Sequence, residues 1–498
     1  MPSTVQLYDN VFAGLRSAAL AKLTTQVLSW AGMVYIVRQL DSHAFGTYGI
    51  ATVILSYGIM VFEGGMLEAL IQHPPDTRQE RRSTFTALLL SAVVLTAAVI
   101  LLAPPLSRWF HDRSVQPVLA LLSVIVVLTA LCMLPLAELM RRMNFKLLAL
   151  ISSIQALLAT ITTVALAYRG YGVWALVWGA VAGALVRAVL LNWKGRGLQW
   201  PTLRFLPAMR YARFAGTLVL DNVLFRWYTT VDTLFLGRWA GTGTLGYYTL
   251  GQDIANLPLE KIASVVNDVS LPAYSELQAD RRRAAHLMLE TLRTHATVGF
   301  PLFWGLAAVA GPAVLVLFGE KWSPAVLPLM ALAFVAPLRL IGSVETPLLT
   351  GLGRPDVLLK TKLILVPCMT LALVVGCMTG GLVGASLAWV LVFPICYLLS
   401  FRWVLSHIEV SLRQVASIAR APCLSALCMA LTVTGCDLAL LANGVTPLFR
   451  LIAEMALGSL LYPLLLWALD RHAFNLLRER LLRVAGRRAP VAAATGCQ

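Results

Sequence analysis

A chain of 498 residues that is 58% hydrophobic and only 13% charged cannot cover itself with polar surface as a set of water-soluble domains. Its mean hydropathy of +0.76 indicates that lipid solvates most of it. The net charge of +16 raises the question of nucleic-acid binding, but the basic residues lie in twos and threes between apolar stretches, and this argues against that class.

Apolar stretches long enough to cross a bilayer, about 20 residues each, follow one another from residue 11 almost to residue 470. Arg16 and Lys22 interrupt the first stretch and no small-residue cleavage site follows it, so we expect a retained helix and not a signal peptide. Length and Gly, Pro and charge punctuation predict an all-α polytopic membrane protein with twelve to fourteen transmembrane helices. The fourteen predicted spans are 15–37, 45–71, 83–103, 115–136, 147–167, 171–191, 211–235, 244–271, 286–317, 325–350, 357–377, 382–401, 417–436 and 447–469.

Lysine and arginine alternate between the loops on the two sides of these spans, as expected when positively charged short loops remain cytoplasmic. One set of loops and the tail carry most of them, at Arg78, Arg81, Arg82, Arg141, Arg142, Lys146, Lys194, Arg196, Arg204, Arg210, Arg213, Arg281, Arg282, Arg283, Arg354, Lys360, Lys362, Arg402, Arg413, Arg420 and from Arg471 to Arg488. The intervening loops hold far fewer, among them Arg108, Arg113, Arg169, Arg238 and Lys321. Both termini are therefore predicted to be cytoplasmic, and the basic clusters can also touch anionic lipid headgroups.

An internal repeat divides the chain. The segment 38–48 matches 238–248 with Arg, Gly and Tyr recurring at an offset of 200, and Gly170, Leu176 and Trp178 match Gly381, Leu387 and Trp389 at an offset of 211. An even number of spans in each half gives parallel repeats, which usually enclose a substrate path. We predict six-helix bundles at 1–206 and 207–408, an added helix pair at 409–470 and a basic tail at 471–498; the alternative is that Gly-x-Tyr is ordinary turn chemistry.

Polar residues recur inside the spans at helical spacing. The first helix carries Lys22, Gln26 and Ser29 on one face, and the seventh carries Asn222, Arg226 and Thr229 at the 200-residue offset. Charged groups at membrane depth usually line a water-filled cavity or pair with one another. We therefore expect the two stripes to face each other across a cationic cavity, with these candidate binding residues: Lys22, Gln26, Asn222, Arg226, Gln252, Asn256 and Arg339.

Further polar residues extend this cavity. Arg187 and Arg293 are additional cations, the second helix supplies Thr52, Ser56, Glu63 and Glu68, and the eighth supplies Asp253 and Glu260. The alternative is that Arg226 with Asp232, or Arg339 with Glu345, are structural ion pairs or reach to the interface. The carboxylates that we would examine for proton or sodium coupling are Asp232, Asp253 and Glu260.

Motifs of catalysis are missing from the sequence, so we expect no enzyme, no cofactor and no metal. The run 241–246 fits G-x-G-x-x-G, but it joins two membrane helices without a preceding strand and is interpreted as a turn. We find no P-loop, nucleophile elbow, H-E-x-x-H or C-x-x-C motif, and the eight cysteines are read as small hydrophobic residues or tail. The tail from Asp470 alternates Leu and Arg like an amphipathic helix on the membrane surface.

Two stretches carry a family resemblance. Residues 45–49 leading into Phe62-Glu63-Gly64-Gly65-Met66, and the run 231–238 followed by 245–248 and Asn256-Leu257-Pro258, resemble the Wzx-type polysaccharide flippases, in particular the WzxC-like branch of the multidrug/oligosaccharidyl-lipid/polysaccharide exporter superfamily. The resemblance covers roughly residues 10–410, and Phe62-Glu63 departs mildly from the usual acidic-first order.

This resemblance implies two six-helix bundles that form a V around a central cationic cavity. It also implies a substrate, an oligosaccharide repeat unit on undecaprenyl pyrophosphate, moved from the cytoplasmic to the periplasmic leaflet of a bacterial inner membrane. The implied partners are membrane lipids, a polysaccharide polymerase and chain-length or export proteins. Sugars need neutral polar groups and aromatic faces, for which Trp30, Trp227 and Tyr228 are candidates, although they can equally be an interfacial aromatic belt.

Rival functions remain open. A flippase for lipid-linked peptidoglycan precursors fits the same physics with a different glycan. An ion-coupled multidrug antiporter of the same superfamily would want a predominantly acidic and aromatic cavity. A membrane-embedded glycan polymerase or ligase would usually show a large periplasmic loop, whereas the connections here are short.

Overall fold

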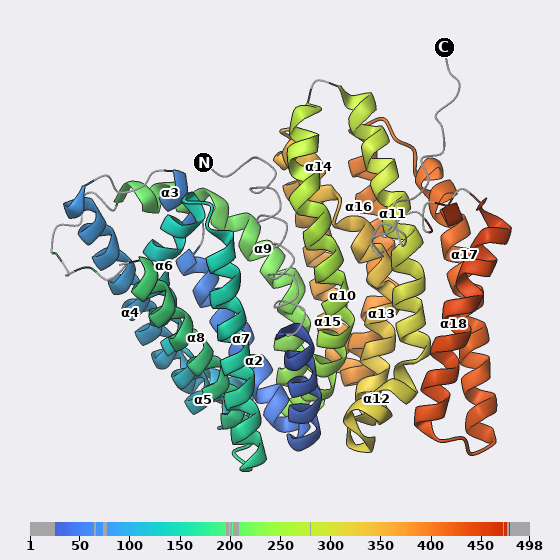
Figure 1. The fold of residues 1–498 in the computed structure, drawn as a ribbon, viewed down its shortest axis with the longest axis horizontal. Coiled ribbons are helices and arrows are strands. Elements are labelled where there is room, and N and C mark those ends of the chain that lie inside the picture. Colours follow the sequence, from blue (N-terminus) through green and yellow to red (C-terminus); the bar gives the residue numbers. More distant parts are fainter. Residues whose placement is uncertain are drawn as a thin grey trace, which may run out of the picture. The chain divides into compact units, whose positions relative to one another are not determined.

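The computed structural model describes the backbone at residues 25–63, 66–72, 77–195, 199, 202, 209–278, 280–471, 473–475 and 478. All regular secondary structure in these ranges is helical, which confirms the all-α prediction (Figure 1). The basic tail beyond residue 478 lies outside the described residues, as does the predicted first helix up to residue 24.

The chain forms two compact units. Unit 1 comprises 1–249 and 373–382, and unit 2 comprises 250–372 and 383–498. The elements of unit 1 are helical residues 25–39, α2 (Ser42–Glu63), α3 (Met66–Gln72), α4 (Arg78–Trp109), α5 (Val115–Leu122), α6 (Val124–Arg141), α7 (Phe145–Tyr168), α8 (Val173–Gly195), α9 (Met209–Trp239) and the beginning of α10 (Gly241–Glu276). The predicted boundary between residues 206 and 207 separates the two sequence repeats, whereas the two units are defined by spatial contacts. That boundary stays a prediction.

Unit 2 contains the rest of α10 and the C-terminal helices. Its elements are α11 (Arg281–Ala308), α12 (Ala310–Phe318), η2 (Glu320–Ala325), α13 (Val326–Gly342), α14 (Glu345–Gly351), most of α15 (Pro355–Leu387), η3 (Ala388–Val392), α16 (Phe393–Ser406), α17 (Leu412–Ala442) and α18 (Pro447–Leu469). The weakly defined C-terminal pair is thus present as α17 and α18, which pack side by side (Figure 1).

Eight helices in the described ranges are long and apolar enough to cross a membrane, and α11 with α12, bent by 65°, adds a ninth candidate. The eight are Arg78–Trp109, Val115–Arg141, Phe145–Tyr168, Val173–Lys194, Glu320–Gly351, Pro355–Ser406, Leu412–Ala442 and Pro447–Leu469. The chain is therefore a multi-pass membrane protein, while the total of fourteen spans stays a prediction.

Two glycines interrupt the helical path at the 211-residue repeat offset. Gly170 has φ +78° between α7 and α8, and Gly381 has φ +52° inside α15. This left-handed region favours glycine because it has no Cβ. The break at Gly381 falls between the predicted spans 357–377 and 382–401, and the turn at Gly170 falls between the predicted spans 147–167 and 171–191.

The 200-residue repeat appears as a reciprocal close contact between the starts of α2 and α10. A Cβ added to Gly46 would lie 1.8 Å from the carbonyl oxygen of Thr242, and one added to Gly246 would lie 1.8 Å from the carbonyl oxygen of Ser42. Each contact is the other shifted by 200 residues, and Gly49 similarly faces Thr249. The two backbones cross too closely for any larger residue, so the packing of the helices requires glycine at both positions.

The α4–α5 loop supports the same end of α2 through Asp112. Its carboxylate accepts hydrogen bonds from the hydroxyl of Thr47 at 2.9 Å and the backbone N–H of Ser114 at 2.8 Å, and it lies 3.1 Å from His43 Nε2. Burial alone would raise the pKa of this carboxyl group, but these partners together outweigh burial and lower it.

A buried ionic cluster holds the C-terminal pair. Arg450 of α18, 5% exposed, donates from Nε and Nη2 to Oδ1 of Asp437 on α17 at 2.8 and 2.5 Å, and the fully buried Glu454 lies one helical turn from Arg450. None of these three residues was among the candidates selected from the sequence. It explains why two helices with mostly lipid-exposed surfaces stay together, since separating them would leave unpaired charges in an apolar medium.

We expect Gly46→Ala and Gly246→Ala each to lower the unfolding temperature of the purified protein in detergent. The added methyl group meets a main-chain carbonyl, which cannot rotate away, and such overpacking costs about 1–3 kcal/mol. Gly243→Ala is the matched control, because a Cβ there lies 3.9 Å from its nearest neighbour, and it should be neutral or stabilising. Equal unfolding temperatures for all three variants would contradict the close crossing.

Candidate functional site

The structure tests the predicted polar stripes only in part. Lys22 and Asn222 lie outside the residues whose side chains are described, whereas Gln26 is half-buried within helical residues 25–39. The opposition of the two stripes therefore stays a prediction. The candidate residues that are described fall into two groups, one in each unit.

The group in unit 1 surrounds Arg226 on α9, which is half-buried. The hydroxyl of Thr230, one turn later, donates to the backbone carbonyl of Arg226 at 2.7 Å and lies 2.7 Å from the hydroxyl of Tyr57 on α2. The guanidinium group of Arg226 is close enough for its positive charge to interact with the hydroxyl group of Tyr57. Sequence reasoning missed Tyr57, although it directly follows Ser56, which was selected on the same helix.

Asp232, a predicted coupling carboxylate, is fully buried and held in place. Tyr248 Oη donates to its Oδ2 at 2.6 Å, and the backbone N–H of Thr233 donates to its Oδ1 at 2.8 Å. Tyr248 is the tyrosine of the 200-residue repeat, so the sequence signal was present, but this residue was noticed only as part of the repeat. These contacts tie α9 to α10, and a role in ion coupling stays a prediction.

In unit 2, two of the predicted binding residues meet. Arg339 Nη1 on α13 donates to Asn256 Oδ1 on α10 at 2.8 Å, and its guanidinium carbon lies 5.2 Å from the ring centre of Trp389 in η3. Trp389 is 1% exposed, so other side chains enclose it, while Arg339 itself is half-buried. An amide and an aromatic face orient the guanidinium without cancelling its charge, because neither is an anion.

The predicted polar residues of α10 lie on two adjacent helical stripes. Gln252 and Asn256 are one turn apart and half-buried, and Asp253 and Glu260 are seven residues apart, exposed and close enough for their charges to interact. Two carboxylates on one face could attract a cation or share a proton. Ion coupling by Asp253 and Glu260 stays a prediction.

Other selected residues have local partners. The hydroxyl of Thr52 donates to the carbonyl of Tyr48 and that of Ser56 to Val53, so these groups are satisfied by their own helix. The side chain of Glu63 and that of Glu68 lie outside the described residues.

Among the aromatic candidates for sugar contact, Trp30 is 45% exposed and Trp227 packs edge-on against Phe235, with ring centres 6.2 Å apart. Within the described residues, no three His, Cys, Asp or Glu side chains are grouped to hold a metal ion.

The sequence of this chain is similar to those of known polysaccharide biosynthesis proteins. The profile of the family described as polysaccharide biosynthesis protein matches residues 35–327. The succinoglycan biosynthesis transport protein ExoT of Rhizobium meliloti is 28% identical, over 96% of this chain and 96% of that protein. The lipopolysaccharide biosynthesis protein WzxC of Escherichia coli is 25% identical, over 80% of this chain and 81% of that protein.

The fold resembles a solved transporter structure. The lipid II flippase MurJ, in an inward closed conformation, superimposes with a TM-score of 0.73, and the match covers 94% of this chain and 99% of that one at 15% identity. At this identity the likeness concerns the fold alone. It agrees with the two-repeat, all-helical architecture inferred from the sequence.

We expect Arg226→Ala to reduce transport at least tenfold per folded molecule, and Arg226→Lys to recover part of it because the charge survives while the fork of donors is lost. Lys22→Ala should act in the same direction. The unfolding temperature should change little for Arg226→Ala, because Asp232 is held by Tyr248 and Thr233.

Tyr248→Phe is the contrasting control. It removes a donor from a buried carboxylate and should lower stability by about 1–3 kcal/mol. If Arg226→Ala lowers the unfolding temperature as much as Tyr248→Phe and the double variant with Asp232→Asn restores it, Arg226 is the structural partner of Asp232 and leaves the proposed site.

Proposed function

This chain belongs to the polysaccharide biosynthesis protein family, and we propose that it is a flippase for undecaprenyl-pyrophosphate-linked oligosaccharide repeat units. It moves them from the cytoplasmic to the periplasmic leaflet of a bacterial inner membrane, for the synthesis of an exopolysaccharide or another surface polysaccharide. The observation that carries the proposal is the match to the succinoglycan biosynthesis transport protein over nearly the full length of both chains.

The chemistry of the described site supports such a substrate. A pyrophosphate needs cations whose positive charge is not already neutralised, and Arg339 is oriented by the neutral Asn256 and by Trp389. The sugars need donors, acceptors and flat apolar faces, which Gln252 and the aromatic residues offer. The isoprenoid tail can stay in lipid while the polar head crosses.

The sequence has no motif for nucleotide binding or hydrolysis. We therefore expect the energy for transport to come from another source. An ion gradient acting through Asp253 and Glu260, or consumption of the product by a polymerase in the periplasm, would both draw the reaction forward. The partners that follow are a polysaccharide polymerase and chain-length or export proteins. Both termini are proposed to lie in the cytoplasm, as the alternation of basic loops predicts.

Transport of a lipid-linked peptidoglycan precursor is the second candidate, favoured by the fold shared with the lipid II flippase. The sequence relatives weigh against it, because those named here are biosynthesis proteins of succinoglycan and lipopolysaccharide. An ion-coupled multidrug antiporter fits less well, since the positive charge of Arg339, held by neutral partners, would repel the cations that such transporters usually carry.

Deletion of the gene should abolish one surface or secreted polysaccharide while its complete lipid-linked repeat unit accumulates. The reason is that assembly on the cytoplasmic leaflet continues when only the crossing is blocked. Extraction of the lipid-linked pool and analysis of its glycan by mass spectrometry measures this. An incomplete oligosaccharide would instead identify an enzyme of assembly, and loss of peptidoglycan precursor turnover would favour the second candidate.

The orientation is tested by labelling single cysteines in a background without the eight natural ones. Cysteines placed next to Arg81, Arg141, Arg204 and Arg282 should react with a membrane-impermeant reagent only after the membrane is opened, because basic loops remain cytoplasmic. Cysteines next to Arg169 and Lys321 are the matched positions that should react in intact spheroplasts. Labelling of the connection between α10 and α11, residues 277–280, from the periplasmic side would overturn the orientation.

A further inference from the structure

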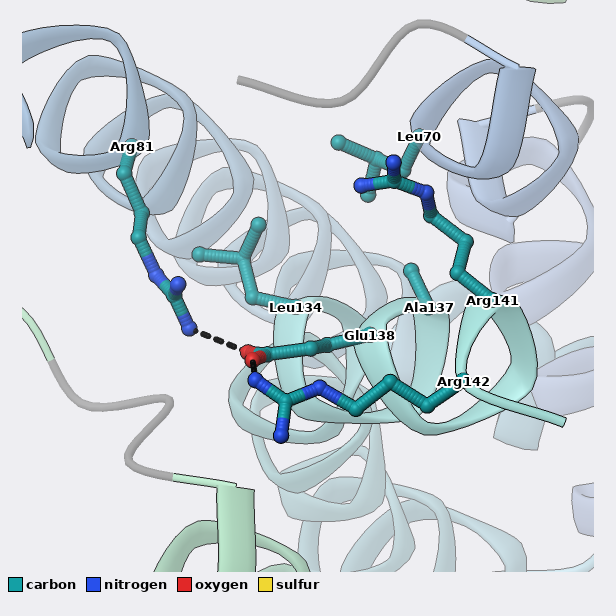
Figure 2. A pocket seen from close by; sticks show the side chains of 7 residues that line it. All are labelled: Leu70, Arg81, Leu134, Ala137, Glu138, Arg141 and Arg142. Carbon is teal, nitrogen blue, oxygen red and sulfur yellow. Dashed lines mark hydrogen bonds and ion pairs between the residues drawn. The ribbon is translucent and has the colours of Figure 1, made fainter. Parts of the chain in front are cut away.

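A pocket of 190 Å³ lies in unit 1, apart from the residues proposed for transport. It is lined by Leu70 of α3, Arg81 of α4, Leu134, Ala137, Glu138 and Arg141 of α6, and Arg142, which caps α6 (Figure 2). Its floor is apolar and its rim carries three guanidinium groups. It is smaller than the roughly 300–1,000 Å³ of pockets that enclose drug-sized ligands, and so too small for an oligosaccharide.

The rim keeps a positive charge after its internal ion pairs are counted. Glu138 accepts from Arg81 Nη2 at 2.7 Å and lies 2.5 Å from Arg142 Nη2, so one carboxylate serves two guanidinium groups. Figure 2 shows the guanidinium of Arg141 beside Leu70, on the other side of the pocket from Arg81. Among the described residues, no carboxylate pairs with Arg141. Three cations and one anion leave two positive charges uncompensated.

One donor group of the rim also lacks an acceptor. The Nε atom of Arg81 is buried and has no hydrogen-bond partner among the described residues. A buried donor without an acceptor costs about 1–3 kcal/mol. An anion with several acceptor oxygens would satisfy such donors while neutralising the surplus charge, and a phosphate matches the fork of a guanidinium group.

The position of the pocket selects the source of that phosphate. Arg81 lies in the first turn of one candidate span, Arg78–Trp109, and Arg141 is the last residue of the next, Val115–Arg141. The rim is therefore at the boundary between the apolar part of these helices and water, which is the depth of phospholipid headgroups. The apolar floor of Leu70, Leu134 and Ala137, each at most 5% exposed, offers a narrow contact that suits the glycerol carbons next to a headgroup phosphate.

We propose that this pocket binds the phosphate headgroup of an anionic membrane phospholipid, held by Arg81 and Arg141. Glu138 engages Arg81 and Arg142 in ion pairs and thereby lowers the affinity. The site concerns the lipid environment of the transporter and not its cargo. Binding can be measured without transport, so the proposal can fail while the proposed function stands, and the reverse.

The test is a titration of the purified full-length protein in detergent with short-chain phosphatidylglycerol, with phosphatidylcholine as the zwitterionic comparison and inorganic phosphate as the soluble one. Phosphatidylglycerol should bind saturably and more tightly than phosphatidylcholine. Arg81→Gln and Arg141→Gln should each weaken it about fivefold, since a basic residue near an anionic lipid surface contributes about 1 kcal/mol. Arg413→Gln, which removes an exposed arginine at the start of α17, is the matched control and should leave the affinity unchanged.

Glu138→Gln separates a binding site from a purely structural ion cluster. Removal of the carboxylate should tighten phosphatidylglycerol binding about fivefold, because it frees two guanidinium groups. Weaker binding in Glu138→Gln, equal affinity for both lipids, or inorganic phosphate that binds as tightly with the same dependence on Arg141 would each overturn the proposal. Should Glu138→Gln fail to fold, Arg141→Gln still decides it, because Arg141 has no carboxylate partner among the described residues to strand.

Discussion

In a chain solvated by lipid, a polar group at membrane depth is costly unless it finds a partner inside the protein. Several described residues meet this constraint, in three ways. Hydroxyls such as Thr52 return to their own helix backbone, buried carboxylates such as Asp232 take neutral donors, and Arg450 takes a carboxylate. Helix contacts are consequently specified by a small number of polar pairs placed between otherwise interchangeable apolar surfaces.

Close backbone approach is the second means of specifying helix contacts, because apolar side chains gain little from one another when lipid tails are equally apolar. Gly46 and Gly246 allow α2 and α10 to cross closely. Gly46 lies against the carbonyl of Thr242, and Gly246 lies against the carbonyl of Ser42. The arrangement is symmetric with respect to the repeat. It explains why a pattern that looks like turn chemistry in the sequence recurs at an offset of 200 residues. The glycines are needed for packing between helices, and the turn is secondary.

The sequence predicted the helical class, the positions of most helices and the repeat, because lipid solvation makes apolar length the dominant signal. It predicted less of the site. Asn256 and Arg339 were both selected and do meet, but Trp389 and Tyr248 were noticed only as repeat residues, and Tyr57 was missed. Helical periodicity tells which residues share a face of one helix; it does not tell which face of another helix they touch. The cluster of Asp437, Arg450 and Glu454 escaped for the same reason, since its members lie on two helices.

The partners of the arginines distinguish their roles. Arg450 is paired with Asp437, so its positive charge is neutralised and the pair serves stability. Arg339 is held by an amide oxygen and an aromatic ring, which fix the direction of the guanidinium and leave its charge intact. A transporter of anions needs the second kind, because a cation already neutralised by a carboxylate would have to exchange that partner for the substrate. Such an exchange would be slow if the carboxylate were buried and would strand it in an apolar medium. The neutral partners of Arg339 avoid both problems, and for this reason Arg339 is better suited than an ion-paired arginine to bind and release a pyrophosphate.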